Sequence, residues 1–409
     1  MKWLQLALRN SRRNARRSVI TGASVAAGTI AILLTVGYML ATFDGVKEGS
    51  IRGGSGHMQI AFAGEFRGDA ELPLQYGIRQ ARLEQLTKRV EAADHVHYSF
   101  PRLAFEGLIT NGGRTVIFSG RGVVPVRERR LARYVTPLSD GVGLDEIDYT
   151  KDYYHIVLGK ELARIIKAKV GDFVTLMSML PDGGLNAADF EVDGIIETGI
   201  PETDKRYVLV PIQAAKEFLL TEKVSRLVVV LDDNDMTGGV KDKLERIVDG
   251  LSIKTWVDLN PFYGQLVQLY VNQFIVFGVI IAIIVLLSIT NTVFMSIMER
   301  VPEIGIMRSL GIPLQEIQKC FIYEAAIIGM LGSLCGVILT FVLCSLITHL
   351  KIPLPPPPGR TIAYPLSIYF DSLSAIVTFL TMLIISSIAA WFPSRHISKI
   401  NVVEALKHT

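Results

Sequence analysis

The chain has 409 residues, of which 50% are hydrophobic, and its mean hydropathy is +0.37. This composition excludes an ordinary soluble protein and predicts that the apolar excess lies in a few long segments. The formal net charge is +3, and the three cysteines (Cys320, Cys335 and Cys344) lie in or beside one apolar run, which excludes an outer domain held by disulfides.

Four apolar runs are long enough to cross a bilayer, which takes about 20 helical residues for roughly 30 Å of hydrocarbon. They lie near residues 19–43, 274–298, 322–347 and 373–391. A signal peptide is the alternative for the first run, which follows a basic segment. Its length exceeds the roughly 7–15 residues of a signal-peptide core, and YMLATFDGV is a poor cleavage site, so we expect a retained helix.

Basic residues beside the spans predict the orientation. The first 18 residues contain six Lys and Arg and no acid, and the last 17 contain three against Glu404. We therefore expect both termini and the loop 299–320 to be cytoplasmic, and residues 44–270 and 348–372 to face outward. The large outer segment has 28 basic and 33 acidic residues, so the basic excess lies on the inner side.

The outer segment begins and ends with similar patterns. A strand (56–62), a helix with apolar Leu83, Leu86 and Val90 (79–94) and two strands across an NGG turn (102–110 and 114–123) come first. The end repeats strand, helix and strand at 225–232, 238–250 and 253–259. Two such stretches around a large insertion predict a split β-α-β layer closed by distant halves of the sequence.

The insertion, about residues 127–222, predicts a small β subdomain. It contains a short helix, a Gly171-Asp172 turn, a PDGG hairpin turn at 181–184 and several strands. In the short outer loop, KIPLPPPPGR (351–360) has four successive prolines and predicts a stiff polyproline II spacer.

Residues that carry chemistry are scarce. No phosphate-binding G-x-x-x-x-G-K-[ST] motif occurs, so we expect this chain not to hydrolyse ATP and to hold no cofactor. His95 and His97 lack a third ligand, which predicts no metal site. Within the spans the main ionisable residue is Glu324, at the cytoplasmic end of the third, where it can reach the interface. An enzyme or an ion-coupled transporter is therefore poorly supported.

The third span has a face of small residues, Gly329, Gly332 and Gly336, and the last two form a G-x-x-x-G motif that allows close helix approach. We expect helix packing there, either within the chain or across a dimer.

Between the second and third spans, ERVPEIGIMRSLG predicts a helix of about nine residues. Pro302 and Glu303 suit its first turn and Gly311 its left-handed end. It is either a solvated connector or a rigid contact for a cytoplasmic partner.

This segment resembles the cytoplasmic coupling element of the FtsX/MacB/Lol superfamily of ABC transporter permeases, the type VII or mechanotransmission class, with the approximate pattern E-R-x-x-E-I-G-I-[LM]-R-[AS]-[LI]-G. The resemblance covers most of the chain. LALRNSRRNARRS is similar to the family's amphipathic N-terminal helix, GHMQI to its first outer strand, and NVVEALK to P-x-E-A-L-R, with Val402 for the proline and Lys407 for the arginine. It implies that the ATPase-coupling residues are Glu299, Arg300, Pro302, Glu303, Ile304, Gly305, Met307, Arg308 and Gly311.

The resemblance also implies the architecture. The fold class would be an α-helical membrane protein with four transmembrane helices, one long and three shorter, plus a large extracytoplasmic α+β domain like the MacB periplasmic core. The expected segments are an amphipathic helix (1–18), the first span (19–43), the periplasmic domain (44–270), the second span (271–298), the coupling loop (299–320), the third span (321–347), the Pro-rich loop (348–372), the fourth span (373–392) and a cytoplasmic tail (393–409).

The function implied is that of a permease in the bacterial inner membrane that moves amphiphilic cargo, such as lipoproteins or hydrophobic compounds, with the lipoprotein-releasing LolC/LolE-like subgroup closest in layout. A separate ATPase subunit would bind ATP and Mg. The other expected partners are a second permease chain (identical or paralogous), membrane lipids and a periplasmic carrier or adaptor, with no nucleic acid. The alternative is an FtsX-like signalling scaffold that activates a periplasmic cell-wall hydrolase.

Overall fold

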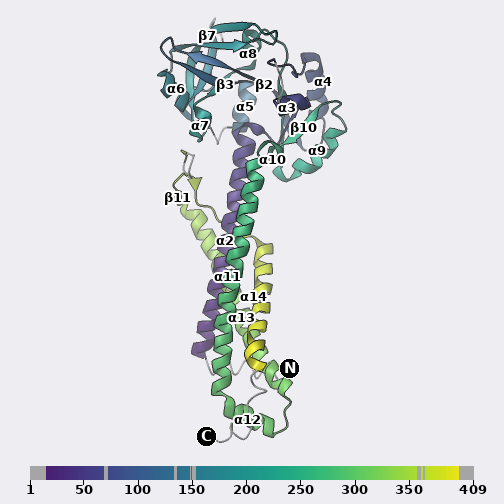
Figure 1. Ribbon diagram of the computed structural model, residues 1–409, viewed down its shortest axis with the longest axis vertical. Helices are drawn as coiled ribbons and strands as arrows, with labels where there is room; N and C mark the ends of the chain where they lie inside the picture. Colours follow the sequence, from purple (N-terminus) through teal and green to yellow (C-terminus); the bar gives the residue numbers. More distant parts are fainter. Residues whose placement is uncertain are drawn as a thin grey trace. The chain divides into compact units, whose positions relative to one another are not determined.

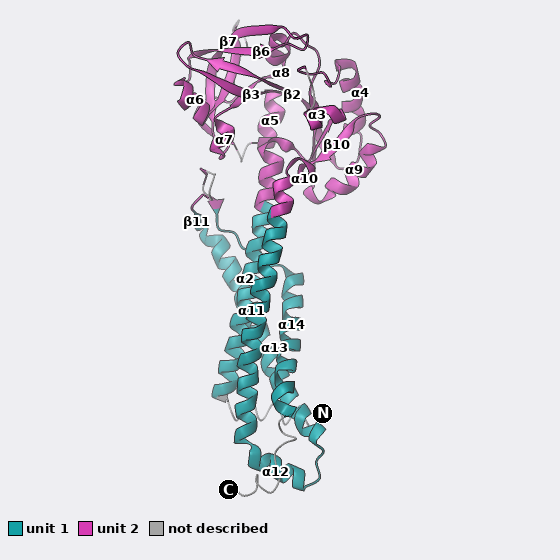
Figure 2. Ribbon diagram, in the orientation of Figure 1, with its two compact units in different colours: residues 1–44, 266–354, 365–409 teal, residues 45–265, 355–364 magenta. Residues whose placement is uncertain are grey.

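The computed structural model describes residues 15–68, 72–132, 136–147, 149, 153–356, 361–362 and 364–395. Most of the predicted N-terminal helix and tail, including Val402 and Lys407, and the centre of the Pro-rich loop therefore lie outside the described residues. The chain divides into two compact units (Figure 2). Unit 1 comprises residues 1–44, 266–354 and 365–409, and unit 2 comprises residues 45–265 and 355–364.

Unit 1 contains the long helices α2 (Ala15–Ser50), α11 (Pro261–Glu299), α13 (Leu314–Leu350) and α14 (Ser372–Ser394), of which α2 and α11 continue into unit 2. Within the described residues, these four are long and apolar enough to cross a membrane, which confirms the expected four spans.

Their lengths differ from the expectation of one long and three shorter spans. The first three have 36, 39 and 37 residues and the fourth has 23. At 1.5 Å per residue, three helices reach about 54–59 Å, well beyond a hydrocarbon core of about 30 Å. Residues 15–18 and 261–270, which were expected to belong to the N-terminal helix and to the periplasmic domain, are continuous with the first and second spans. Apolar content identifies only the part of a helix that is suited to lipid.

The helices of unit 1 form a bundle around one apolar core (Figure 1). The helices α2 and α11 lie side by side, and Thr21 Oγ1 donates to Thr292 Oγ1 at 2.9 Å. Across the bundle, Thr290 Oγ1 donates to the carbonyl of Ala389 on α14 at 3.1 Å. These hydroxyls satisfy their hydrogen bonds between or along helices, as expected where lipid offers no partner.

Unit 2 contains a mixed sheet whose ten described strands run in the order β10-β1-β9-β2-β3-β8-β5-β7-β4, with β6 paired to β2 and β7. The strands are β1 (Met58–Ala61), β2 (Val96–Thr110), β3 (Thr115–Val123), β4 (Leu138–Gly141), β5 (Tyr154–Gly159), β6 (Phe173–Met179), β7 (Leu185–Ile196), β8 (Tyr207–Pro211), β9 (Arg226–Leu231) and β10 (Ser252–Thr255). The helices of unit 2 are α3 (Ala63–Arg67), α4 (Gln80–Glu91), α5 (Pro125–Ala132), α6 (Lys160–Ile166), α7 (Pro201–Asp204), α8 (Ile212–Phe218), α9 (Thr237–Glu245) and α10 (Trp256–Leu259), with a 3-10 turn, η2 (Asn234–Met236). The short strands β11 (Pro353–Leu354) and β12 (Tyr364–Pro365) lie in the connection from α13 to α14.

The prediction that distant halves of the outer segment close one β-α-β layer is confirmed. The strand β1 pairs antiparallel with both β9 and β10, and helices α4 and α9 supply Leu83, Leu86, Val90, Val240 and Leu244 to the core beneath them. One local expectation was wrong, because the last strand stops at Thr255 and WVDL forms α10. Thr255 and Asp258 form a capping box, which favours a helix start over an extended strand.

The predicted β subdomain does not have a core of its own. Its strands share one core with the second half of β2 and with β3, including Leu103, Phe105, Ile109 and Phe118. The long β2 pairs with β9 through its first half and with β3 and β6 through its second. A strand of 15 residues that belongs to two cores cannot be assigned to either from its periodicity.

Within unit 2, α2 ends in a π-helical turn, η1 (Ile51–Ser55), that is hydrogen-bonded to the sheet. The Arg102 side chain donates to the carbonyl of Gly54 and pairs with Glu128 on α5, with Nη2 2.7 Å from both carboxylate oxygens. Arg102 is buried, so this pair anchors the turn in a medium where an unpaired charge is costly.

A second set of hydrogen bonds between the end of α2 and the sheet involves His57 and Asn234. His57 Nε2 lies 2.7 Å from Asn234 Oδ1, and its Nδ1 accepts a hydrogen bond from the backbone N–H of Leu231 at 3.2 Å. Asn234 Nδ2 also donates to Glu48 near the end of α2 at 2.5 Å. His57 is therefore held as the neutral Nε2–H form, and burial lowers its pKa.

Candidate functional site

The segment between α11 and α13 forms a separate short helix, α12 (Val301–Ser309). Pro302 lies in its first turn, where a missing N–H costs no hydrogen bond, and Glu303 is the acid of that turn. The chain then turns at Gly311, whose φ of +83° favours glycine. Its N–H donates to the carbonyl of Arg308 at 3.0 Å, so the helix ends in a defined turn.

The two faces of α12 differ in their surroundings. Ile304 and Gly305 are buried in the bundle core of unit 1. On the outer side, Ile306 is 52% and Leu310 75% exposed, although both are large and apolar. Leu310 does not share the buried side of Ile304, because the helix ends at Ser309 and Leu310 follows in the turn.

Glu299 and Arg300, the first two residues of the motif, point to different helices. Glu299 pairs with Arg17 of α2, with Arg17 Nη1 2.6 Å from Oε2 and Nη2 2.5 Å from Oε1. Arg300 Nη1 donates instead to Glu324 Oε2 on α13 at 3.3 Å. Consecutive charged residues thus connect the end of α11 to two neighbouring helices.

These two pairs differ in burial. Arg17 and Glu299 are each about half exposed at the side chain, whereas Arg300 is 5% and Glu324 8% exposed. Glu324 was expected to reach the interface, but it lies in the bundle against Arg300. The Nε and Nη2 groups of Arg300 and Ser296 Oγ are buried without a hydrogen-bond partner among the described residues.

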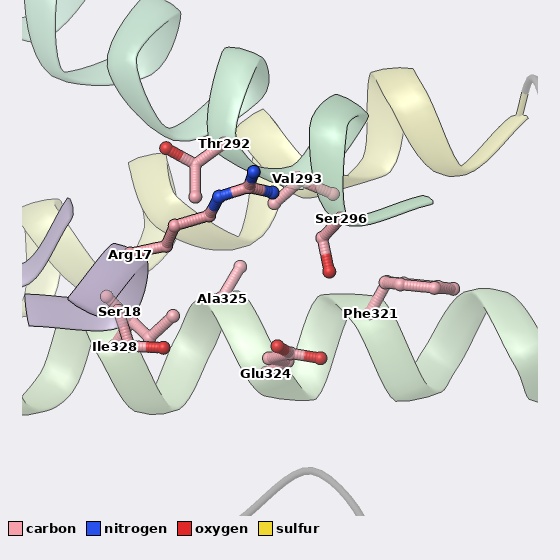
Figure 3. Close-up of a pocket in the computed structure, with 9 residues that line it drawn as sticks. All are labelled: Arg17, Ser18, Thr292, Val293, Ser296, Phe321, Glu324, Ala325 and Ile328. Carbon is pink, nitrogen blue, oxygen red and sulfur yellow. The ribbon is translucent and has the colours of Figure 1, made fainter. Parts of the chain in front are cut away.

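A cavity of about 20 Å³ lies beside the Glu324 carboxylate (Figure 3). Figure 3 shows Arg17 reaching from α2 towards α11 and Glu324 on the facing α13. The lining is mixed polar and apolar: Arg17, Ser18, Thr292, Val293, Ser296, Phe321, Glu324, Ala325 and Ile328. A volume of this size holds about one water molecule and no cargo.

Of the nine residues expected to couple to an ATPase, the structure therefore places Arg300, Ile304 and Gly305 inside the bundle and Glu303 on its surface. The buried members position the helix rather than face outward. The sequence did not indicate that Ile306 and Leu310 are exposed. It also did not indicate that Arg17 is the charge partner of Glu299 and Glu324 that of Arg300. A lone acid in an apolar run was a signal for Glu324, but its partner was not visible in the sequence.

The three glycines of α13 pack within the chain. A Cβ on Gly332 would lie 2.6 Å from the carbonyl oxygen of Gly22 on α2, and one on Gly336 would lie 2.7 Å from Cβ of Thr29. Gly329 faces Ser386 of α14 instead. The alternative left open by the sequence, contact within the chain or across a dimer, is therefore decided for these residues in favour of the chain itself.

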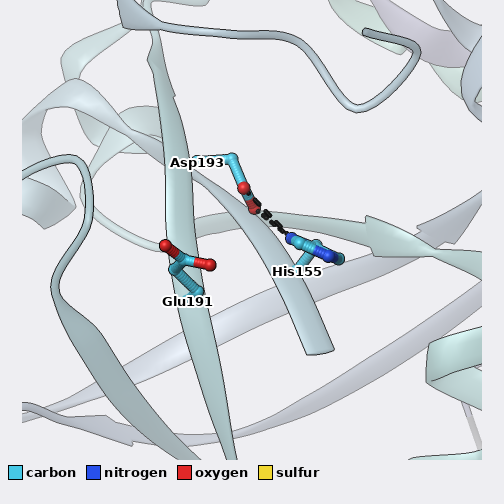
Figure 4. A group of neighbouring side chains, drawn as sticks. All are labelled: His155, Glu191 and Asp193. Atoms are coloured by element: carbon cyan, nitrogen blue, oxygen red, sulfur yellow. Dashed lines mark hydrogen bonds and ion pairs between the residues drawn. The ribbon is translucent and has the colours of Figure 1, made fainter. Parts of the chain in front are cut away.

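His155, Glu191 and Asp193 in unit 2 are close enough to be considered as metal ligands (Figure 4). His155 Nδ1, however, lies 3.0 Å from both oxygens of Asp193, and the other ring nitrogen points away from Glu191. The geometry is that of a buried histidine–carboxylate pair between β5 and β7. Burial raises the pKa of Asp193, and the hydrogen bond from His155 opposes that rise.

Comparisons with known proteins identify families and relatives that match the chain. A family model described as FtsX-like permease C-terminal matches residues 275–402, and one described as MacB-like periplasmic core domain matches residues 18–247, more than half of the chain. The lipoprotein-releasing system transmembrane protein LolC of Neisseria meningitidis is 24% identical, over 99% of this chain and 98% of that protein. LolE of Haemophilus influenzae is 23% identical over 64% and 63%. The periplasmic region of MacB from Actinobacillus actinomycetemcomitans aligns at 13% identity and a TM-score of 0.36, over 52% of this chain and 94% of that one.

Proposed function

The chain belongs to the FtsX-like ABC transporter permeases that carry a MacB-like periplasmic core domain, and from this premise we propose that α12 is the docking helix for a separate cytoplasmic ATPase subunit. The proposed cycle is one in which ATP and Mg bind to that subunit and its closure displaces α12. The continuous helices α2 and α11 would carry the movement to unit 2, which we place in the periplasm.

The observation that carries this proposal is that α12 and the turn after it have one buried side and one exposed side. Ile304 fixes the helix in the bundle core, while Ile306 and Leu310 expose large apolar side chains outside the apolar spans. Covering such a side chain contributes about 1.5–3 kcal/mol, so a protein partner is favoured over solvent. The basic residues beside the spans support a cytoplasmic position for this loop.

The proposed cargo is amphiphilic, such as a lipoprotein or a hydrophobic compound. Relatives named as lipoprotein-releasing proteins support this class, and LolC matches nearly the whole chain. The proposed assembly contains a second permease chain, identical or paralogous, in the bacterial inner membrane, with a periplasmic carrier or adaptor as a further partner.

The direct test is copurification of the full chain with its cognate ATPase from detergent or nanodiscs. Ile306→Glu with Leu310→Glu is expected to abolish copurification and chain-stimulated ATP hydrolysis while the chain remains monodisperse. The matched control is Leu185→Glu in unit 2, where an 81% exposed leucine receives the same charge and ATPase binding should be retained. Undiminished binding by the double variant would show that α12 is only a connector.

A further inference from the structure

We infer that Arg300 and Glu324 form an electrostatic latch that holds the base of α12 against α13, and that Arg300 is a positioning residue rather than an ATPase contact. The inference rests on the proposed function of α12 in so far as the latch would transmit force from that helix. The pair itself is a structural feature: Arg300 Nη1 lies 3.3 Å from Glu324 Oε2, and both residues are more than nine-tenths buried.

Arg300 lies where three helices meet. Its N–H donates to the carbonyl of Ile297 in the last turn of α11 at 3.1 Å, and its own carbonyl accepts the N–H of Ile304 in α12 at 2.9 Å. Its side chain reaches Glu324 on α13. The backbone of one residue therefore joins α11 to α12, while its side chain fixes that joint to α13.

Because the pair is buried, the connection depends on the presence of one positive and one negative charge. Removing one member of a buried ion pair leaves an uncompensated charge in a medium that solvates it poorly, whereas exchanging the two charges keeps the attraction. Arg300 also has unused hydrogen-bond donors, because its Nε and Nη2 groups have no partner among the described residues.

The neighbouring pair cannot replace the latch. Glu299 is bound to Arg17 on α2, so it faces a different helix, and both side chains are substantially exposed. The attraction within an exposed pair is screened by water and salt more strongly than the attraction within a buried pair. We therefore assign the stronger restraint on α12 to Arg300 and Glu324.

A labelling experiment tests the latch without any ATPase. In the full chain with Cys320, Cys335 and Cys344 replaced by alanine, Ile304→Cys places a thiol on the buried face of α12, and its reaction rate with a water-soluble maleimide reports detachment of the helix. Arg300→Glu and, separately, Glu324→Arg are expected to raise this rate by about tenfold or more. The charge exchange, Arg300→Glu with Glu324→Arg, should return it to within about threefold of the unmodified pair.

Two controls complete the design. Leu310→Cys, at an exposed position, should react at one rate in every background, which verifies reagent access. Lys319→Glu reverses a charge on the exposed side of α13 and should leave the rate at Ile304→Cys unchanged. The latch is refuted if the single reversals leave the rate unchanged, if the charge exchange reacts as fast as they do, or if Lys319→Glu has the same effect.

Addition of the ATPase separates this inference from the proposed function. Latch variants should still bind the ATPase through Ile306 and Leu310. Their chain-stimulated rate of ATP hydrolysis should be about tenfold lower than that of the unmodified chain. If the unmodified chain binds no ATPase, the proposed function fails while the labelling result still decides the latch. If latch variants bind and stimulate normally, force transmission by the latch is refuted.

Discussion

Gly332 on α13 and Gly22 on α2 lie in direct backbone contact, such that a Cβ on Gly332 would be 2.6 Å from the carbonyl oxygen of Gly22. Two helices can approach so closely only when no side chain separates them. This contact, with that of Gly336 and Thr29 one turn further along, fixes the distance between the first and third spans.

Gly332→Leu should therefore separate α2 from α13. Overpacking of this kind costs about 1–3 kcal/mol, because the backbone of α2 must move. We expect a lower thermal unfolding temperature of the purified chain in detergent. Gly278→Leu on α11, where a Cβ meets nothing within 4 Å, is the control and should behave as the unmodified chain. Equal unfolding temperatures for the two variants would contradict the assigned packing.

The buried pair of Arg102 and Glu128 should dominate the stability of unit 2 near the end of α2. Arg102→Met leaves Glu128 unpaired and is expected to cost about 3–5 kcal/mol, whereas Arg102→Met with Glu128→Leu should recover much of the loss. Denaturation followed by circular dichroism of the full chain gives the difference. Arg164→Met, which breaks an exposed pair with Glu161, should cost no more than about 1 kcal/mol. A similar loss in both single variants would mean that burial of Arg102 is unimportant.

The stability of unit 2 should fall in mild acid because of His57. Burial holds the pKa of His57 below its unfolded value of about 6.5, so the unfolded chain binds more protons in acid. The stabilisation is complete above about pH 6.5 and decreases as the pH falls towards the folded pKa. Thermal unfolding between about pH 7.5 and 5 should show this slope, and His57→Gln should reduce it. An unchanged slope in the variant would exclude His57 as its source.

Reversal of both charges on α12, Glu303→Lys with Arg308→Glu, should impair ATP hydrolysis by the reconstituted complex more than the folding of the chain. Glu303 is exposed and Arg308 half-buried, so both are placed to contact a partner. The measurement is hydrolysis with and without cargo, alongside the amount of copurified ATPase. Normal cargo-dependent hydrolysis would assign both residues to the local stability of the loop.

Apolar run length, the periodicity of apolar residues and short helix-end signals were sufficient to predict four spans, the split β-α-β layer and the short helix at 301–309. The spans and the short helix are local features, because a span needs only enough apolar residues and a helix end needs only a proline, an acid or a glycine at the right place. The same reasoning could not give helix lengths, since α2 and α11 continue through polar residues whose helical state depends on their neighbours.

The partners of individual side chains in distant segments were decided only by the tertiary structure. The sequence shows Glu299, Arg300 and Glu324 as three charges, but only the packing of α2 and α13 assigns Arg17 to the first and pairs the other two. Likewise, GMLGSLCG shows a face of small residues, while the bundle determines that it receives α2 and α14. Signals for the start and the end of a short helix lie within a few residues, whereas ion pairing and close packing can depend on groups hundreds of residues apart, as with Arg17 and Glu299.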